Sequence, residues 1–231
     1  SFSKNKNTVA FVAAPFKGKP YLFTYNFETA EIDTLSGVAQ GHYPLFFDQD
    51  LNVIAGEKID PVSGVKTLDY FEKGSWREIQ SYSWSAERFL RPGLKSILGV
   101  RKDGRAVYCT DNTNTDRTVL KSFDMDTKQT ETLLNEQSSD LMTNSFVANA
   151  EGRPLAIANH YTRRLWHSLD KQYEKDIKFL ADQLPDFQIL DITPDFKFWV
   201  IESMNGGANI TYRYDRERKT LKKWFTDFTE L

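Results

Sequence analysis

Features that commonly reveal a function are scarce in this sequence of 231 residues. Its single cysteine excludes an internal disulfide, and the compartment stays open, with the cytoplasm favoured. Lysine and arginine (30 residues) nearly balance aspartate and glutamate (32), which argues against nucleic acid or an anionic membrane as a partner. No run approaches the roughly 18 apolar residues of a membrane helix, and residues 1–6 are not of signal-peptide type. We therefore expect no membrane span and no targeting segment in this chain.

Residues that build catalytic and metal sites are equally sparse. The histidines His42, His160 and His167 lack the spacing of metal ligands, so we expect them on loops or facing solvent. Cys109 lies in an alternating strand pattern, which indicates a small buried residue. The sequence places no histidine beside it that could stabilise a thiolate. A structural role is therefore predicted for this cysteine.

Two loops resemble ligand sites only in part. Residues 111–116 alternate oxygen-bearing side chains, but Arg117 follows where an EF-hand has glycine, and Phe123 replaces the bidentate glutamate. The pair Gly206-Gly207 is followed by none of the residues of a phosphate-binding loop. We predict polar hairpin loops at both places, and no catalytic residue, cofactor or metal ion in this chain.

One hairpin pattern occurs five times in the sequence. In each copy, a strand rich in apolar and aromatic residues meets a short polar turn. Aligned on an acidic turn residue, successive copies lie roughly 44, 54, 44 and 45 residues apart, which is typical of four-stranded propeller blades. The aligned residues are Glu28, Glu72, Asp126, Asp170 and Asp215.

Local signals agree with this repeat. Asp103-Gly104 stands between two apolar runs and predicts a tight hairpin, since glycine tolerates the positive φ that such turns need. Residues 162–169 read as a strand, whereas residues 170–184 carry apolar residues at helical spacing, which predicts a helix capped by Asp170 and ended by Pro185. We therefore predict one all-β domain over residues 1–231. It is a partial β-propeller of four to five four-stranded antiparallel blades, with one short helix near residues 170–184.

Six segments of the C-terminal part of the sequence form a recognisable series. They are Gly152–Ile157, Tyr161–Trp166, Leu169-Asp170, Leu184-Pro185, Ile192–Asp195 and Tyr212–Arg216. This series resembles the last propeller blades of prolyl oligopeptidase family serine peptidases, in particular the acylaminoacyl-peptidase-like branch. The resemblance is most specific over residues 140–231 and is one of pattern before that.

This resemblance implies that an α/β-hydrolase domain follows Leu231 in the full-length protein, and that one or more opening blades of a seven-bladed propeller are absent. The 231 residues contain no G-x-S-x-G, the elbow that exposes the serine of such hydrolases. The catalytic residues of the family belong to that other domain, so none is carried over. The implied function is a non-catalytic propeller that gates the access of peptide substrates to the active site of its own hydrolase domain.

Alternatives remain open from the sequence alone. A stand-alone propeller-like scaffold that binds a protein or a carbohydrate would show the same repeat, because fold does not fix function. The cluster of Tyr161, Arg163 and Arg164 is the candidate ligand-facing surface, with an exposed strand end as the competing interpretation. An open ring of blades leaves strand edges unpaired, so a homo-oligomer is a further possibility.

Overall fold

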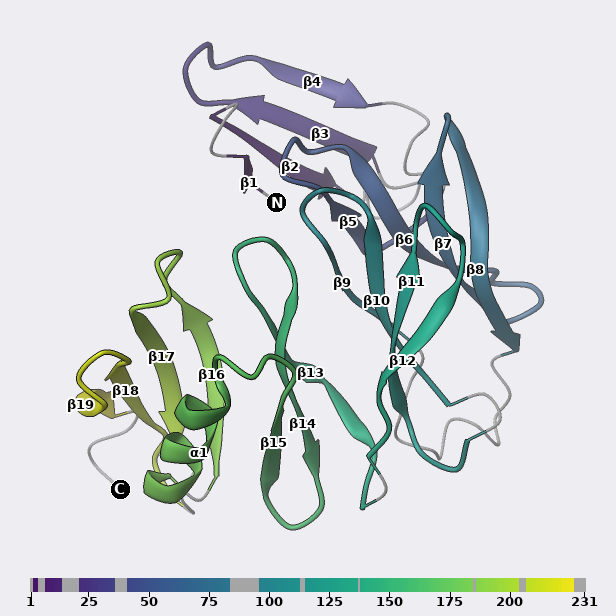
Figure 1. Cartoon of the computed structure of the whole chain (residues 1–231). Coiled ribbons are helices and arrows are strands. Elements are labelled where there is room, and N and C mark those ends of the chain that lie inside the picture. The colour runs from purple at the N-terminus through teal and green to yellow at the C-terminus, as the bar shows by residue number, and fades with distance from the viewer. Residues whose placement is uncertain are drawn as a thin grey trace. The chain divides into compact units, whose positions relative to one another are not determined.

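The computed structural model describes residues 2–3, 7–13, 21–35, 41–83, 96–112, 115–136, 138–184, 186–203 and 207–226. These residues form five antiparallel sheets and one helix, and within each sheet the strands follow one another in sequence order (Figure 1). The chain divides into two compact units. One comprises residues 1–111 and 121–132, and the other comprises residues 112–120 and 133–231. None of the described helices is long and apolar enough to cross a membrane.

The first unit holds two sheets and most of a third, named blades 1 to 3 in chain order. Blade 1 contains β1 (Phe2–Ser3), β2 (Thr8–Ala13), β3 (Tyr21–Asn26) and β4 (Ile32–Leu35). Blade 2 contains β5 (Leu45–Phe47), β6 (Val53–Ile59), β7 (Val65–Glu72) and β8 (Ser75–Ser83). Blade 3 contains β9 (Ile97–Val100), β10 (Ala106–Asp111), β11 (Val119–Asp124) and β12 (Thr130–Leu134).

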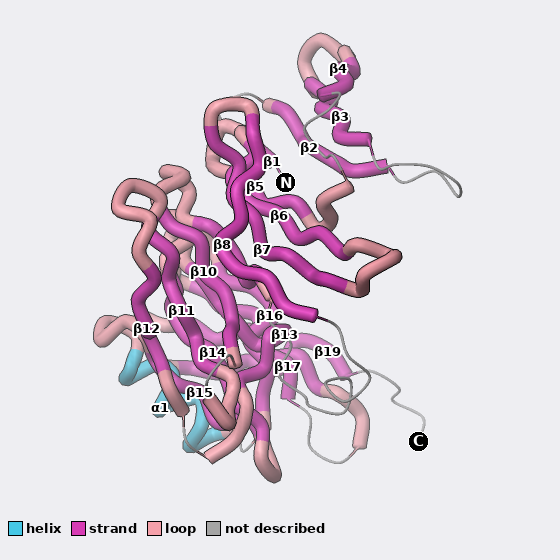
Figure 2. The backbone as a smooth tube through the Cα atoms, turned by 90° about the vertical axis from the view of Figure 1, so that its right-hand side faces the viewer, coloured by secondary structure: helices cyan, strands magenta, loops and turns pink. Residues whose placement is uncertain are grey.

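The second unit holds blades 4 and 5 and the helix. Blade 4 contains β13 (Leu141–Ala148), β14 (Pro154–His160) and β15 (Arg164–Ser168), and α1 (Glu174–Gln183) follows it. Blade 5 contains β16 (Phe187–Ile192), β17 (Phe198–Ser203), β18 (Ile210–Asp215) and β19 (Thr220–Thr226). Figure 2 shows that strands dominate the described chain and that α1 alone is drawn as helix. The predicted all-β fold with one short helix is thus confirmed, and the sheets number five.

The hairpin repeat has a common turn geometry in three of the blades. In blades 1, 3 and 5, the last residue of the third strand is Asn26, Asp124 or Asp215. Its side-chain oxygen accepts hydrogen bonds from backbone N–H groups two or three residues later, as in an Asx turn. Four residues after it the backbone adopts a positive φ, at Ala30, Lys128 and Lys219. The polar residue that closes each strand therefore shapes the turn of the blade.

Blade 4 departs from the predicted four strands. Its described sheet has three strands, and the segment after β15 forms α1 in place of a fourth. The predicted cap is wrong: the helix begins at Glu174 with Tyr173 as its N-cap, while the carboxylate of Asp170 accepts a hydrogen bond from the N–H of Gln172 in a preceding turn. Pro185, the predicted end of the helix, lies outside the described residues. The strand predicted over residues 162–169 is also shorter, at Arg164–Ser168.

The helix forms because its apolar side has a surface to cover. Ile177 and Leu180 of α1 are buried in one cluster with Trp199 and Tyr214 of blade 5 and with Leu155 of blade 4. Trp199, Tyr214 and Leu180 are fully buried, which removes large apolar areas from water. Packing of the apolar stripe against the two sheets thus stabilises a short helix that would be marginal on its own.

Candidate functional site

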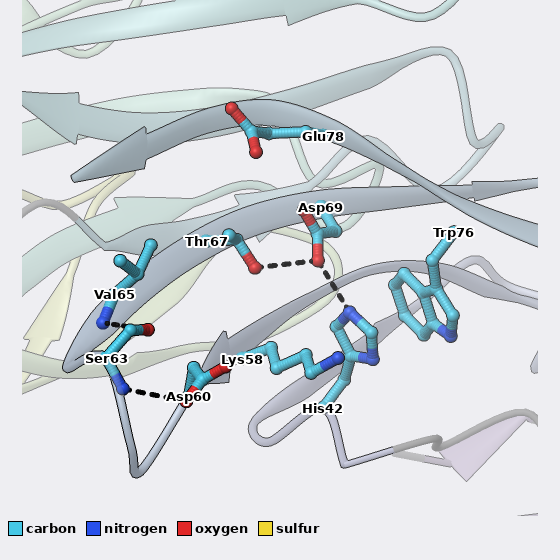
Figure 3. A pocket seen from close by; sticks show the side chains of 9 residues that line it. All are labelled: His42, Lys58, Asp60, Ser63, Val65, Thr67, Asp69, Trp76 and Glu78. Carbon is cyan, nitrogen blue, oxygen red and sulfur yellow. Dashed lines mark hydrogen bonds and ion pairs between the residues drawn. The ribbon is translucent and has the colours of Figure 1, made fainter. Parts of the chain in front are cut away.

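A pocket of the first unit lies on one face of blade 2. It measures about 500 Å³. Strand alternation places its lining on one side of the sheet, since Gly56 and Glu78 both pair with Asp69 and Lys58 pairs with Thr67. Figure 3 shows the residues around the opening. The lining residues are His42, Lys58, Asp60, Ser63, Val65, Thr67, Asp69, Trp76 and Glu78.

A buried histidine–aspartate pair forms the floor of this pocket. His42 precedes β5, is 2% exposed, and its Nε2 lies 2.6 Å from Oδ2 of Asp69. The hydroxyl of Thr67 donates to the same carboxylate oxygen at 2.8 Å. The imidazole of His42 stacks on Trp76, with ring centroids 3.7 Å apart and planes 12° apart. A hydrogen bond to Asp69 and a ring stack on Trp76 therefore orient this histidine, and Thr67 in turn orients the carboxylate of Asp69 (Figure 3).

Gly56 makes this stack possible. A Cβ on Gly56 would lie 3.0 Å from the Cβ of His42, from a methyl carbon of Leu45 and from the ring of Trp76. That separation is below ordinary van der Waals contact, so a larger residue would push at least one of these side chains aside. The stack of His42 on Trp76 therefore requires glycine, which has no side chain, at position 56.

The rim of the pocket is charged. Asp60 accepts backbone hydrogen bonds from Ser63 and Val62 in the β6–β7 turn, and these bonds lower the pKa of its carboxyl below the ordinary value. Glu78 and Lys58 are exposed on the neighbouring strands. Carboxylates outnumber ammonium groups in this lining, so the rim is acidic and suits a polar or cationic group better than an anion.

The pocket has the chemistry of a binding site. Ser63 and Thr67 are its hydroxyl groups, but Thr67 donates to Asp69 and the Ser63 oxygen accepts from the N–H of Val65, so neither is positioned as a nucleophile activated by His42. Across the described ranges, no group of three or more His, Cys, Asp or Glu side chains could hold a metal ion. The arrangement can hold and orient a polar ligand.

A buried ion pair and a hydrogen bond connect this sheet to blade 3. Lys66 Nζ lies 2.6 Å from Oε2 of Glu57, and both side chains are 8% exposed. The other oxygen of Glu57 accepts from the N–H of Ile97, the first residue of β9, at 2.6 Å. Glu57 therefore joins two blades as well as neutralising a buried lysine.

The predicted cluster of Tyr161, Arg163 and Arg164 lies in the second unit, at the turn between β14 and β15. Tyr161 is 73% exposed and Arg163 is exposed. Arg164 is half-buried, and its Nη1 lies 3.2 Å from Oδ1 of Asp186. Arg164 thus ties this turn to the segment before β16, whereas Tyr161 and Arg163 are turned to solvent. That the cluster of Tyr161, Arg163 and Arg164 faces a ligand stays a prediction.

The histidine predictions need a correction. His160 is exposed as predicted, but His42 is buried on Asp69, and His167 is half-buried. His167 Nε2 lies 2.9 Å from Oδ1 of Asn159 and 3.5 Å from Glu136, and burial lowers its pKa more than Glu136 raises it. Both histidines found acceptors that are distant in sequence, which single-sequence spacing could not indicate.

Cys109 is buried, as predicted, within the cluster of blades 2 and 3. Burial raises the pKa of its thiol to about 12, so the thiolate is not populated at neutral pH. The loop predicted over residues 111–116 is described only in part, since residues 113–114 lie outside the described ranges. Its first carboxylate, Asp111, is bound at 2.5 Å by Lys121. Gly206 of the second predicted loop also lies outside them.

The pocket residues were missed by sequence reasoning. Asp69 and Trp76 stand in the second copy of the hairpin repeat, where they were interpreted as ordinary strand residues. His42 stands in a Gly-His-Tyr-Pro segment without a recognised motif. The available signal was the carboxylate of Asp69 between the apolar residues Leu68 and Tyr70 of a strand, because a polar group that becomes buried there needs a hydrogen-bond partner.

Comparison with known proteins identifies the fold. No protein-family model matches the chain. Solved structures superpose on nearly all of it, including TolB from Acinetobacter baumannii (TM-score 0.56, 11% identity, 95% of this chain and 52% of that chain). Prolyl oligopeptidase B from Galerina marginata gives a TM-score of 0.58 at 12% identity, covering all of this chain and 34% of that one. This chain has a β-propeller fold.

A curated relative adds a likeness in sequence. Dipeptidyl aminopeptidase BIII from Pseudoxanthomonas mexicana is 24% identical over 181 residues, which cover 78% of the propeller. The chain spans only 25% of the length of this relative. The predicted resemblance to the propeller domains of prolyl oligopeptidase family peptidases is thus confirmed, and the propeller is of a kind found in peptidase-like proteins.

Proposed function

We propose that this propeller is the non-catalytic domain of a serine peptidase, and that it controls which peptides reach the active site of a hydrolase domain. The sequence likeness to dipeptidyl aminopeptidase BIII over most of the propeller carries this proposal. The superposition on prolyl oligopeptidase B, of which the chain covers about a third, supports it. Neither the pocket of blade 2 nor the 231-residue sequence supplies a serine elbow, which is consistent with chemistry located elsewhere.

The physical basis of this control is exclusion by size. A closed ring of rigid blades in front of an active site admits an extended peptide and rejects a folded protein, because the folded protein cannot enter without unfolding. Rigidity is therefore the property that matters. In the second unit it rests on Trp199 of β17, which is fully buried in the cluster that blade 5 shares with blade 4 and α1.

The first test is the activity of the chain itself. The purified 231-residue chain should not hydrolyse dipeptide or N-acylated peptide substrates. The complete product of its gene should hydrolyse them, and a serine-directed inhibitor should abolish that turnover. Turnover by the 231-residue chain alone would contradict the proposal. So would a reading frame that stops soon after Leu231, which favours the scaffold alternative.

The second test addresses the gating. In the complete gene product, Trp199→Ala should loosen blade 5 by about 3–5 kcal/mol, the usual cost of truncating a buried tryptophan. We expect the ratio of kcat/KM for a short peptide over the same sequence embedded in a folded protein to fall. Val62→Ser is the matched control, since Val62 is 95% exposed. An unchanged ratio in the Trp199 variant would refute exclusion by the propeller.

A further inference from the structure

The carboxylate of Asp69, on the floor of the pocket of blade 2, is bonded through one of its two oxygens. Oδ2 accepts from the hydroxyl of Thr67 and lies 2.6 Å from Nε2 of His42. Among the described residues, no group donates a hydrogen bond to Oδ1. Asp69 is only 7% exposed and lines the pocket. A buried carboxylate oxygen needs a donor, so Oδ1 marks a place for a donor that enters from the pocket.

A second carboxylate faces the same space. Asp69 of β7 pairs directly with Glu78 of β8, and Figure 3 shows both side chains at the pocket. The Cβ atoms of directly opposed residues in an antiparallel pair lie about 5 Å apart, and like charges there repel each other. Glu78 is exposed and forms no ion pair with any described residue. A cationic group between the two carboxylates would therefore relieve this repulsion as well as supply the donor to Oδ1.

The lining does not supply that cation from its own lysine. Lys58 pairs with Thr67, two residues along β7 from Asp69. Within the described part of the chain, its ammonium group forms no ion pair with Asp69 or Glu78. A metal ion is a poorer candidate than an organic cation, because no group of three or more His, Cys, Asp or Glu side chains is gathered among the described residues. The pair of carboxylates therefore suits a cationic group carried by a ligand.

The shape of the pocket favours a guanidinium with a carbon chain attached. A guanidinium is planar and presents N–H groups on more than one edge, so it can donate to two carboxylates on neighbouring strands at once, whereas an ammonium is a compact and strongly hydrated charge. Trp76 and Val65 line the pocket on opposite sides of the carboxylate pair along the strands. Their apolar surfaces suit the methylene groups of such a ligand. The volume of about 500 Å³ leaves room for both parts.

We propose that the pocket of blade 2 binds a guanidinium group, which donates to Oδ1 of Asp69 and to the carboxylate of Glu78. The ligand class is a guanidino compound with an aliphatic chain, either the arginine side chain of a peptide or a free small molecule with the same group. Binding involves no covalent step. The pocket is built by blade 2 and the segment before it, so the proposal does not rest on peptidase activity and survives if the proposed function fails.

The test is a titration of the purified protein, followed by the NMR shifts of its backbone amides. The probe is N-acetyl-arginine amide, which has no free amino group. We expect saturable shifts in β7 and β8. N-acetyl-citrulline amide, a neutral analogue of nearly the same shape, should bind at least about tenfold more weakly, because it lacks the charge. Agmatine and a pentapeptide with a central arginine then separate the two sources, since the tighter of the two indicates whether the natural ligand is free or part of a peptide.

Variants assign the binding to the two carboxylates. Glu78→Gln should weaken binding of the arginine probe roughly fivefold, since one charge-assisted contact at an exposed residue is lost. Its exposed side chain makes it a safer variant than Asp69→Asn, which also changes the contact with His42. Glu28→Gln removes an exposed carboxylate from blade 1 and is the matched control, with no expected change.

Three results would overturn the proposal. One is the lack of saturable shifts in β7 and β8 with the arginine probe in excess. Another is equal affinity for the arginine and citrulline probes, which would make the pocket a site for neutral polar ligands. The third is equal weakening by Glu78→Gln and Glu28→Gln, which would reduce the effect to a general attraction of cations by the protein surface.

Discussion

Replacement of Asp176 by asparagine should detach α1 from blade 5. The side chain of Asp176 is buried on the helix, and its carboxylate accepts hydrogen bonds from the hydroxyl of Tyr214 at 2.6 Å, from Arg216 Nε at 2.9 Å and from Lys219 Nζ. All three donors come from β18 and the turn after it. A single carboxylate therefore accepts hydrogen bonds from three donors of the hairpin, in addition to the apolar packing of the helix, and an amide in its place would turn its NH₂ group toward Arg216 and Lys219.

The magnitude follows from the burial of the partners. Removing one member of a buried charge network costs about 3–5 kcal/mol. Arg216 and Lys219 keep 23% and 42% of their side chains exposed, so water can solvate them once the carboxylate is gone. We therefore expect the free energy of unfolding of the second unit to fall by about 2–3 kcal/mol, and by about 1 kcal/mol for Tyr214→Phe, which removes one donor. Amide hydrogen exchange of α1 measures the loss of stability in the Asp176→Asn and Tyr214→Phe variants. Asp182→Asn, at an exposed residue of the same helix, is the matched control.

The pH dependence gives an independent check of the same contact. Burial opposes ionisation of Asp176, but the hydrogen bonds from Lys219, Tyr214 and Arg216 outweigh it, so the pKa lies below the ordinary value of 3.8. The stabilisation is therefore fully present above that ordinary value and is lost as the pH falls through the lowered pKa. In the Asp176→Asn variant, the free energy of unfolding should therefore depend less on pH in the acid range. A cost below about 0.5 kcal/mol, or an unchanged acid limb, would refute the role of Asp176 as the connecting group.

Two further predictions concern the first unit. Gly56→Val should destabilise blade 2 by about 1–3 kcal/mol, because the new side chain displaces His42 or Trp76 from their stack, and denaturant unfolding of this variant against Val62→Ser measures it. A fully stable Gly56→Val protein would show that the stack can relax at no cost. Cys109 should not react with a thiol reagent at neutral pH in the folded chain and should react fully in denaturant, because burial raises its pKa to about 12; rapid labelling of the folded protein would contradict that burial.

Several elements followed from local sequence. The hairpin at Asp103-Gly104 forms as predicted, with φ +74° at Gly104, because glycine accepts the backbone conformation that the turn imposes. Burial of Cys109 was likewise predicted from the strand pattern, although all six residues of its strand, β10, are buried. The start of α1 did not follow from local sequence. Asp170 is a good capping residue by type, but it forms a turn with Gln172, and the helix with its apolar stripe begins later. Tertiary packing of that stripe decided the boundary.

The sequence by itself determined the periodicity of this protein. Strand alternation and the polar residue that ends each hairpin are local properties, so the number and kind of blades could be predicted from them. Only the tertiary structure decided which polar groups meet. His42 finds Asp69 at 27 residues' distance, and Asp176 finds Tyr214 at 38, because pairing across sheets depends on packing that no local pattern encodes. The same packing leaves Phe11 of blade 1 41% exposed, whereas Ile201 of blade 5 is fully buried.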